Sequence, residues 1–249
     1  MAEVIILGSA NSIPDERHEN AHLAIVGQQE FILVDCVGTP IVRLQQAGLD
    51  FKRLRHLVLT HFHPDHVSGV PLLLMNMWLL GRRQPLFLYG LEYTLTRVKW
   101  LMDAYGWQTW PDFFPVHFCE IAEQPLAPVV ETEEFRLWAS PVEHLIPTIG
   151  LRVEAADGGV LAYSCDTQPT PSVVELARGA DVLIHEATGE AVGHSSARQA
   201  GEIAQEAAVR RLYLIHYDVR SDPHALIPQA RQTFQGEVAL AEDFLRLTF

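Results

Sequence analysis

Four side chains that can bind a metal ion fall within one six-residue run, His61-Phe62-His63-Pro64-Asp65-His66. The apolar stretch Leu57-Val58-Leu59 before it is expected to form a buried strand, which would give the run a rigid support. Alternate residues of an extended chain point the same way, so the first two histidines would face one point. The turn at Pro64 would direct the carboxylate and the third histidine to a neighbouring point. Imidazole nitrogens with a carboxylate suit zinc and similar cations, so the run predicts a metal centre.

Two further candidate ligands, Asp166 and His216, each follow a predicted strand, as His61 does. All three therefore leave the same kind of sheet edge. Alone, Asp166 would be interpreted as a turn residue and His216 as a packed residue at a strand end. Together with the run at residues 61–66 they predict one shared site.

A second polar group follows the strand expected at residues 182–185. Glu186 comes directly after that strand, and His194 lies just before a predicted helix, where free N–H groups and the helix dipole favour a phosphate oxygen. Glu186 could hold His194 protonated and oriented as a general acid. The alternative is structural, with Glu186 as a surface residue at a strand end and His194-Ser195 as a helix N-cap. For His185 we expect a structural role or one behind the ligands.

Short apolar or β-branched runs, bounded by turn residues, predict the strands that would position these side chains. The expected strands are residues 4–7, 23–26, 31–34, 56–60, 86–89, 135–140, 149–153, 160–163, 182–185, 212–216 and 238–241. Helical spacing predicts helices over residues 40–47, 68–80 and 196–210, and a capping box of Ser196 and Gln199 begins the last of them. The second half broadly repeats the order of the first. This predicts two sheets packed face to face with helices outside, a four-layer α/β arrangement.

The composition has no break, so residues 1–249 are expected to form a single domain. Acidic residues exceed basic ones by 31 to 18, and the net charge of −13 argues against broad nucleic-acid binding. Three cysteines at unrelated spacings indicate no disulfide framework. The N-terminus lacks a signal-peptide pattern, and the apolar stretch at residues 70–80 is too short to cross a bilayer. We expect a soluble cytoplasmic protein without membrane contacts.

The run at residues 61–66 resembles the signature of the metallo-β-lactamase superfamily, and the chain looks like its ribonuclease Z and phosphodiesterase branch. The resemblance covers almost the whole chain. It is carried by Leu7-Gly8-Ser9, Leu33-Val34-Asp35-Cys36, His144 in the position of the third-motif histidine, Tyr163-Ser164-Cys165-Asp166-Thr167, and Leu214-Ile215-His216-Tyr217. It implies the αββα fold of that superfamily, with two mixed β-sheets between helices.

The resemblance also implies a ligand set and roles for the second group. His61, His63 and His144 would hold one cation, Asp65, His66 and His216 a second, and Asp166 would bridge both. The pairing of Glu186 with His194 is typical of the ribonuclease Z and phosphodiesterase branch, where the two act together on the leaving group. Zinc is the favoured metal, with manganese or iron as alternatives.

The implied function is a phosphodiesterase in which two cations share a hydroxide. Asp65 would orient that nucleophile, His194 would protonate the leaving oxygen, and the N–H groups of Ser195 and Ser196 would offset charge on the phosphate. The expected partner is a small or cyclic phosphodiester, and related enzymes suggest a homodimer. The alternatives are a carboxylic ester, lactone or β-lactam hydrolase with the same metals, and a non-catalytic metal-binding member.

Two departures bear on the substrate and on the site. Transfer-RNA-processing members carry a long basic arm between the third-motif histidine and the bridging aspartate, whereas 21 residues separate His144 from Asp166 here. No arm fits this interval, so RNA is a doubtful substrate and a transfer-RNA 3′ endonuclease is disfavoured. Cys165 occupies a position where glycine is usual and would crowd Asp166. The aromatic residues between Trp100 and Phe114 could form a substrate rim, a dimer surface or part of the core.

Overall fold

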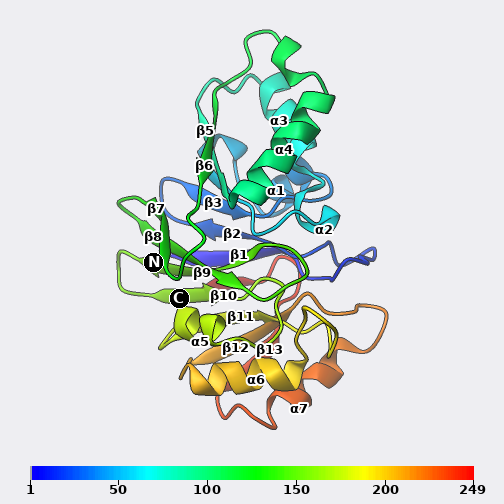
Figure 1. Cartoon of the computed structure of the whole chain (residues 1–249), viewed down its shortest axis with the longest axis vertical. Helices are drawn as coiled ribbons and strands as arrows, with labels where there is room; N and C mark the ends of the chain where they lie inside the picture. Colours follow the sequence, from blue (N-terminus) through cyan, green and yellow to red (C-terminus); the bar gives the residue numbers. More distant parts are fainter. Residues whose placement is uncertain (1) are drawn as a thin grey trace.

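Two seven-stranded sheets pack face to face in the computed structural model, which describes residues 2–249. Helices cover both outer faces, so the layers run helix, sheet, sheet, helix from top to bottom of Figure 1. This confirms the predicted four-layer αββα arrangement with two mixed sheets.

The first sheet has the strand order β14-β1-β2-β3-β4-β5-β6. Its strands are β1 (Glu3–Gly8), β2 (His22–Val26), β3 (Phe31–Val34), β4 (Leu54–Val58), β5 (Leu86–Gly90), β6 (Val116–Glu120) and β14 (Arg246–Thr248). Neighbours are antiparallel from β14 to β3 and parallel from β3 to β6.

The second sheet repeats this pattern with the order β7-β8-β9-β10-β11-β12-β13. Its strands are β7 (Ala127–Glu131), β8 (Phe135–Val142), β9 (Thr148–Ala155), β10 (Val160–Tyr163), β11 (Val182–Glu186), β12 (Arg211–Ile215) and β13 (Glu237–Leu240). Neighbours are antiparallel from β7 to β10 and parallel from β10 to β13. The repetition predicted between the two halves of the chain is therefore confirmed.

Apolar side chains form three buried clusters, one at each interface between layers. In β1, Val4 and Ile6 belong to the cluster between the sheets, whereas Ile5 and Leu7 belong to the cluster under the helices of the first sheet. A strand that is buried on both faces has an unbroken run of apolar residues in the sequence. The central strands could therefore be predicted.

The helices divide between the two outer faces (Figure 1). On the first sheet lie α1 (Pro40–Gln46), α3 (Val70–Leu79) and α4 (Glu92–Ala104), and on the second lie α5 (Pro171–Ala177), α6 (Ala197–Glu206) and α7 (Leu226–Ala230). A short helix, α2 (Pro64–Val67), follows β4, and single turns of 3₁₀-helix cover Phe51–Arg53, Trp107–Thr109 and Pro223–Ala225. The predicted capping box of Ser196 and Gln199 begins α6, and proline at the first or second position begins most of the others.

Some predicted boundaries are wrong, and some elements were not predicted. The strand expected at 56–60 is Leu54–Val58, the helix expected at 68–80 starts at Val70, and the helix expected at 196–210 ends at Glu206. β6, β7, β14, α4, α5 and α7 were missed. β6 and β7 carry half-exposed and polar residues, and Pro128 interrupts β7, so neither shows a clear apolar pattern.

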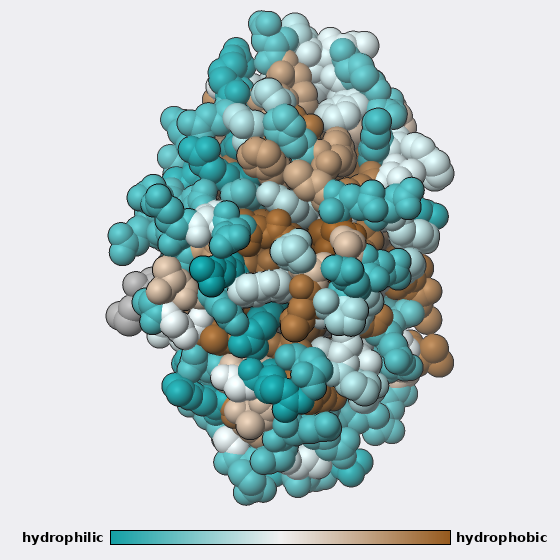
Figure 2. Space-filling model, turned by 60° about the vertical axis from the view of Figure 1, so that its left-hand side comes forward, coloured by the Kyte–Doolittle hydropathy of each residue, from teal (hydrophilic) through white to brown (hydrophobic). Residues whose placement is uncertain are grey.

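The surface is polar over most of the face in Figure 2, with apolar side chains gathered near its middle. Within residues 2–249, no helix has the length and apolar character needed to span a bilayer. The aromatic residues between Trp100 and Phe114, in α4 and the segment after it, divide into two groups. Phe114 is buried, and Trp107, Trp110 and Phe113 pack against the core under the first sheet's helices, whereas Trp100 and Tyr105 are exposed.

Candidate functional site

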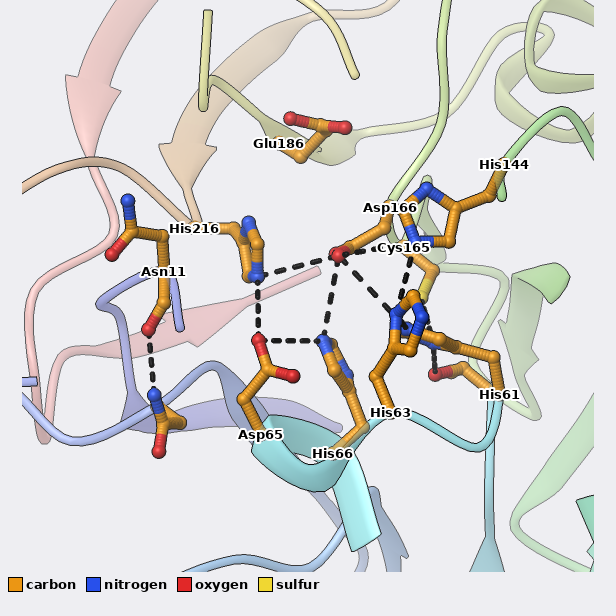
Figure 3. A network of polar contacts seen from close by, with 12 residues as sticks. Asn11, His61, His63, Asp65, His66, His144, Cys165, Asp166, Glu186 and His216 are labelled. Atoms are coloured by element: carbon orange, nitrogen blue, oxygen red, sulfur yellow. Dashed lines mark hydrogen bonds and ion pairs between the residues drawn. The ribbon is translucent and has the colours of Figure 1, made fainter. Parts of the chain in front are cut away.

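The candidate site lies where strand ends from both sheets meet. The run at residues 61–66 follows β4 of the first sheet, whereas the other candidates come from the second sheet, where Glu186 is the last residue of β11 and the rest follow β8, β10, β11 and β12. The structure brings all nine predicted site residues together: His61, His63, Asp65, His66, His144, Asp166, Glu186, His194 and His216. Figure 3 shows most of them converging from both sheets.

Three imidazoles form one half of the site, which we call the histidine half. Nε2 of His61 lies 3.0 Å from Nδ1 of His63, which lies 3.2 Å from Nε2 of His144. Each ring offers one nitrogen, and these three atoms lie within 4.8 Å of one another. They could hold one cation.

A carboxylate and two imidazoles form the other half, which we call the aspartate half. Oδ2 of Asp65 lies 3.8 Å from Nε2 of His66 and 3.5 Å from Nε2 of His216. Both histidines are buried. These atoms also lie within 4.8 Å of one another and could hold a second cation.

One oxygen faces both halves. Oδ2 of Asp166 lies 3.3 Å from Nε2 of His216 and 3.6 Å from Nε2 of His66. It also lies 4.0 Å from Nε2 of His61 and 4.0 Å from Nε2 of His144. Figure 3 shows this carboxylate pointing between the two groups of rings.

Buried polar atoms without a partner support this assignment. Among the described residues, Nε2 of His66, Nε2 of His216 and Oδ1 of Asp166 are buried and have no hydrogen-bond partner. A buried polar group without a partner is costly. A divalent cation would remove that cost, so the residues present fit a metal centre.

The histidines that point Nε2 into the site make a second contact through Nδ1, on the side of the ring away from the site. We call the group that contacts Nδ1 the outer partner of that histidine. Nδ1 of His66 lies 2.8 Å from Oδ2 of Asp35, and Nδ1 of His144 lies 2.7 Å from the carbonyl oxygen of Gly193. Nδ1 of His216 lies 2.8 Å from Oγ1 of Thr188. Such partners fix the tautomer and orient a metal-binding histidine.

Sequence reasoning missed the outer partners. Asp35 directly follows the strand predicted at residues 31–34, so its position at a strand end was a usable signal. For Thr188 and the Gly193 carbonyl we find no comparable signal in the sequence.

Backbone strain concentrates beside the site. Asp35, Cys165 and His216 each follow a strand and adopt left-handed backbone conformations, with φ of 60°, 54° and 56°. Residues other than glycine adopt this region only at a cost, and such conformations cluster at functional sites. Here they turn the chain so that a site residue leaves the sheet edge.

The two halves differ in their electrostatic surroundings. Burial lowers the pKa of His61, of His63 and of His144 below the ordinary histidine value. Burial opposes protonation of His66 too, but Asp166 and Asp35 outweigh it and raise its pKa well above that value. Burial would also raise the pKa of Asp166, yet the neighbouring histidines, led by His216, hold it well below the ordinary range. The site therefore keeps Asp166 ionised and ready to bind a cation.

Glu186 and His194 form a hydrogen-bonded pair beside the two halves. Nδ1 of His194 lies 2.9 Å from Oε1 of Glu186, which is fully buried. The backbone N–H groups of Thr167 and Thr188 also donate to this carboxylate, over 2.8 and 3.1 Å. Burial opposes a charge on His194, but the Glu186 hydrogen bond prevails and raises its pKa. The structural alternative of a surface glutamate is wrong, because Glu186 is inside.

The ring of His194 lies against the site. Its centroid is 4.9 Å from that of His144 and 5.8 Å from that of His216, with which it stacks. The expected role of the Ser196 N–H is wrong, because this group donates to Gln199 within the capping box. His185 is buried, and its Nδ1 lies 2.8 Å from the Glu186 carbonyl oxygen, as expected of a residue behind the site.

The interval between His144 and Asp166 contains β9, β10 and the turn that joins them. This agrees with the two strands predicted there, and the interval carries no arm. Cys165 lies within it, fully buried, with Sγ 3.6 Å from Nδ1 of His61.

Comparison with known proteins gives consistent matches. Residues 30–217 match a family model described as the beta-lactamase superfamily domain. Ribonuclease Z of Methanothermobacter thermautotrophicus is 28% identical, over an alignment that covers 94% of this chain and 92% of the relative. That alignment spans 291 positions, more than the 249 residues of this chain, so part of the relative has no counterpart here.

Solved structures share the fold. The metallo-beta-lactamase fold protein YhfI of Bacillus subtilis superposes with a TM-score of 0.84 at 22% identity, covering 99% of this chain and 98% of the other. The short form of human tRNase Z superposes with a TM-score of 0.79 at 24% identity, with the same coverage. At these identities the likeness concerns the fold.

Proposed function

Because this chain belongs to the beta-lactamase superfamily and is a metal-dependent hydrolase, we propose that it is a binuclear phosphodiesterase. The pair formed by Glu186 and His194 carries the proposal. Hydrolysis of a carboxylic ester or lactone needs the metal-binding groups but no buried glutamate holding a histidine beside them. A phosphodiester with a poor leaving group needs a proton at the departing oxygen, and His194 can provide it.

Seven residues would hold the metal. His61, His63 and His144 would bind one cation, Asp65, His66 and His216 the other, and Asp166 would contact both. Bound there, the cations would supply a Lewis acid that makes water nucleophilic at neutral pH and offsets phosphate charge.

The chain's own residues supply orientation and the proton. Asp65 is the more exposed of the two carboxylates that would bind metal, at 15% of its side chain against 3% for Asp166, and can orient the attacking water. Glu186 keeps the proton on Nδ1 of His194, so Nε2 can deliver a second proton to the leaving oxygen. Because its pKa is raised, His194 remains protonated to a higher pH than an ordinary histidine.

The substrate we propose is a small or cyclic phosphodiester. The ribonuclease Z relatives support phosphodiester chemistry in general. The short, armless interval between His144 and Asp166 and the net charge of −13 weigh against a long polyanion such as RNA.

The test compares substrates that differ in bond type and in leaving group. Purified protein would be assayed on bis-nitrophenyl phosphate, a 2′,3′-cyclic nucleotide, a lactone and a precursor transfer RNA. We expect turnover of the first two. Turnover of the lactone alone would contradict the proposal.

A variant addresses the role of His194. His194→Ala should retain metal, lose activity on the cyclic nucleotide by roughly 10²–10⁴-fold, and lose little on the nitrophenyl ester, whose leaving group needs no proton. His224→Ala, at an exposed histidine on a surface turn, is the matched control. Equal losses on both esters would refute the general-acid role.

A further inference from the structure

The two halves of the site differ in the charge that would attract a cation. The aspartate half has its own carboxylate, Asp65, whereas the histidine half consists of three imidazoles. Asp166 increases the difference, because Oδ2 is nearer to His216 and His66, at 3.3 and 3.6 Å, than to the histidine half. A cation in the aspartate half would therefore lie nearer to more negative charge.

Within the histidine half, His144 has an outer partner at 2.7 Å, the Gly193 carbonyl, but the outer partners of His61 are weaker than those of either histidine in the aspartate half. His66 has the Asp35 carboxylate at 2.8 Å and His216 has the Thr188 hydroxyl at 2.8 Å. Among residues 2–249, the partners of Nδ1 of His61 are Oγ1 of Thr60, at 3.2 Å, and Sγ of Cys165, at 3.6 Å. The Thr60 hydroxyl donates its hydrogen to Asp35 and can therefore only accept from His61, over the longer distance of 3.2 Å, and a thiol sulfur is a weak acceptor. His61 is thus held less firmly than His66 or His216.

The His61 ring must be held by these two groups. If Nε2 binds a cation, Nδ1 carries the hydrogen and has to donate it. His61 is completely buried, so water does not reach it easily. Figure 3 shows the Cys165 sulfur beside the His61 ring, on the side away from Asp65.

Cys165 is present despite a local backbone cost. Its φ of 54° lies in the left-handed region that favours glycine. Glycine there would relieve the strain but remove the thiol, so a side chain at this position has a consequence for His61 that glycine would not have.

We propose that the two halves bind divalent cations with unequal affinity, and that Cys165 is a positioning residue that sets the affinity of the weaker, histidine half through His61. The inference rests on the proposed binuclear function and adds the order in which the two cations bind. The aspartate half fills first, and hydrolysis follows the availability of the second cation.

Titration of the metal-stripped full chain with Co²⁺ tests this, followed by absorption and by competition with a chromophoric chelator. Two binding events are expected, with the first at least about tenfold tighter. Cys165→Ala removes the sulfur but keeps Cβ, whereas Cys165→Gly also relieves the backbone. Both should weaken the second event by about tenfold and alter its absorption bands, while leaving the first event unchanged. Asp35→Asn should weaken the first event, because it removes the carboxylate charge behind His66.

Cys119→Ala, which removes a thiol in β6, is the matched control and should change neither event. An effect in the glycine variant alone would show that the backbone, and not the thiol, matters, and would overturn the role of Cys165. Two equal events in the unaltered protein would overturn the inequality while leaving the binuclear function intact. Binding of a single ion at saturation would overturn the binuclear function itself.

Discussion

Replacing Glu186 with glutamine removes a negative charge from behind His194 with little change in shape. The Glu186 carboxylate is buried and accepts from three donors: the Thr167 N–H at 2.8 Å, the Thr188 N–H at 3.1 Å and Nδ1 of His194 at 2.9 Å. A glutamine has one acceptor oxygen, so its NH₂ group must face at least one of these donors. The bond to His194 is charge-assisted, and such a bond contributes about 1.5–3 kcal/mol. This corresponds to a roughly 10- to 150-fold loss of the protonated acid.

The assay measures kcat/KM against pH for a substrate with a poor leaving group. Glu186 raises the pKa of His194, so the acid is present below that pKa and is lost as the pH rises through it. In Glu186→Gln the alkaline limb should move to lower pH, and kcat/KM above neutrality should fall by about the same 10- to 150-fold. The nitrophenyl ester should be nearly unaffected, as should metal content. Glu190→Gln, at an exposed glutamate of the same loop, is the control. An unmoved alkaline limb, or an equal loss on both esters, would refute the reasoning.

Three further predictions concern the metal centre and the fold. Asp166→Ala should lose both ions and activity together, because Asp166 faces both halves; metal analysis showing two ions retained would contradict this. Burial lowers the pKa of His22 to about 3, so stability present above pH 6.5 should be lost as the pH falls toward 3. Between pH 7 and pH 5 the free energy of unfolding should fall by about 2 kcal/mol more in the unaltered protein than in His22→Leu, as measured by urea titration. Gly193→Ala should cost about 1 kcal/mol or more and weaken metal binding by the histidine half, because φ is 80° and a Cβ would lie 2.9 Å from Nδ1 of His144; unchanged thermal unfolding and metal content would contradict it.

Much of the fold could be predicted because the central strands are buried on both faces. β3 and β10 match their predicted ranges, since an unbroken apolar run bounded by turn residues defines such a strand. β6, with the sequence Val-His-Phe-Cys-Glu, has a half-exposed face and no comparable pattern. α4 buries only one side and carries charged residues throughout. Its sequence therefore did not identify it as a helix, and its contacts with the first sheet are known only from the structure.

The candidate site was predictable where a residue type and a strand end coincide. His61, Asp166 and His216 satisfied both conditions, and the structure places them together. The contacts behind the histidines of the site involve a carbonyl oxygen at His144, a threonine hydroxyl at His216 and a thiol at His61. These groups are common in any chain, and only the three-dimensional arrangement distinguishes the ones that face a histidine. Ser196 shows a different error. Its N–H group was expected to face the phosphate, but it donates to Gln199 within the predicted helix cap.

The most direct test of the account is the number of divalent ions per chain at which phosphodiester hydrolysis appears. Metal-stripped protein would be loaded stepwise with Zn²⁺, with bound metal and hydrolysis of bis-nitrophenyl phosphate measured in each sample. The account predicts that activity rises mainly with the second equivalent and reaches its maximum at two ions per chain. Full activity at one ion per chain, or undiminished activity in the metal-free protein, would contradict it.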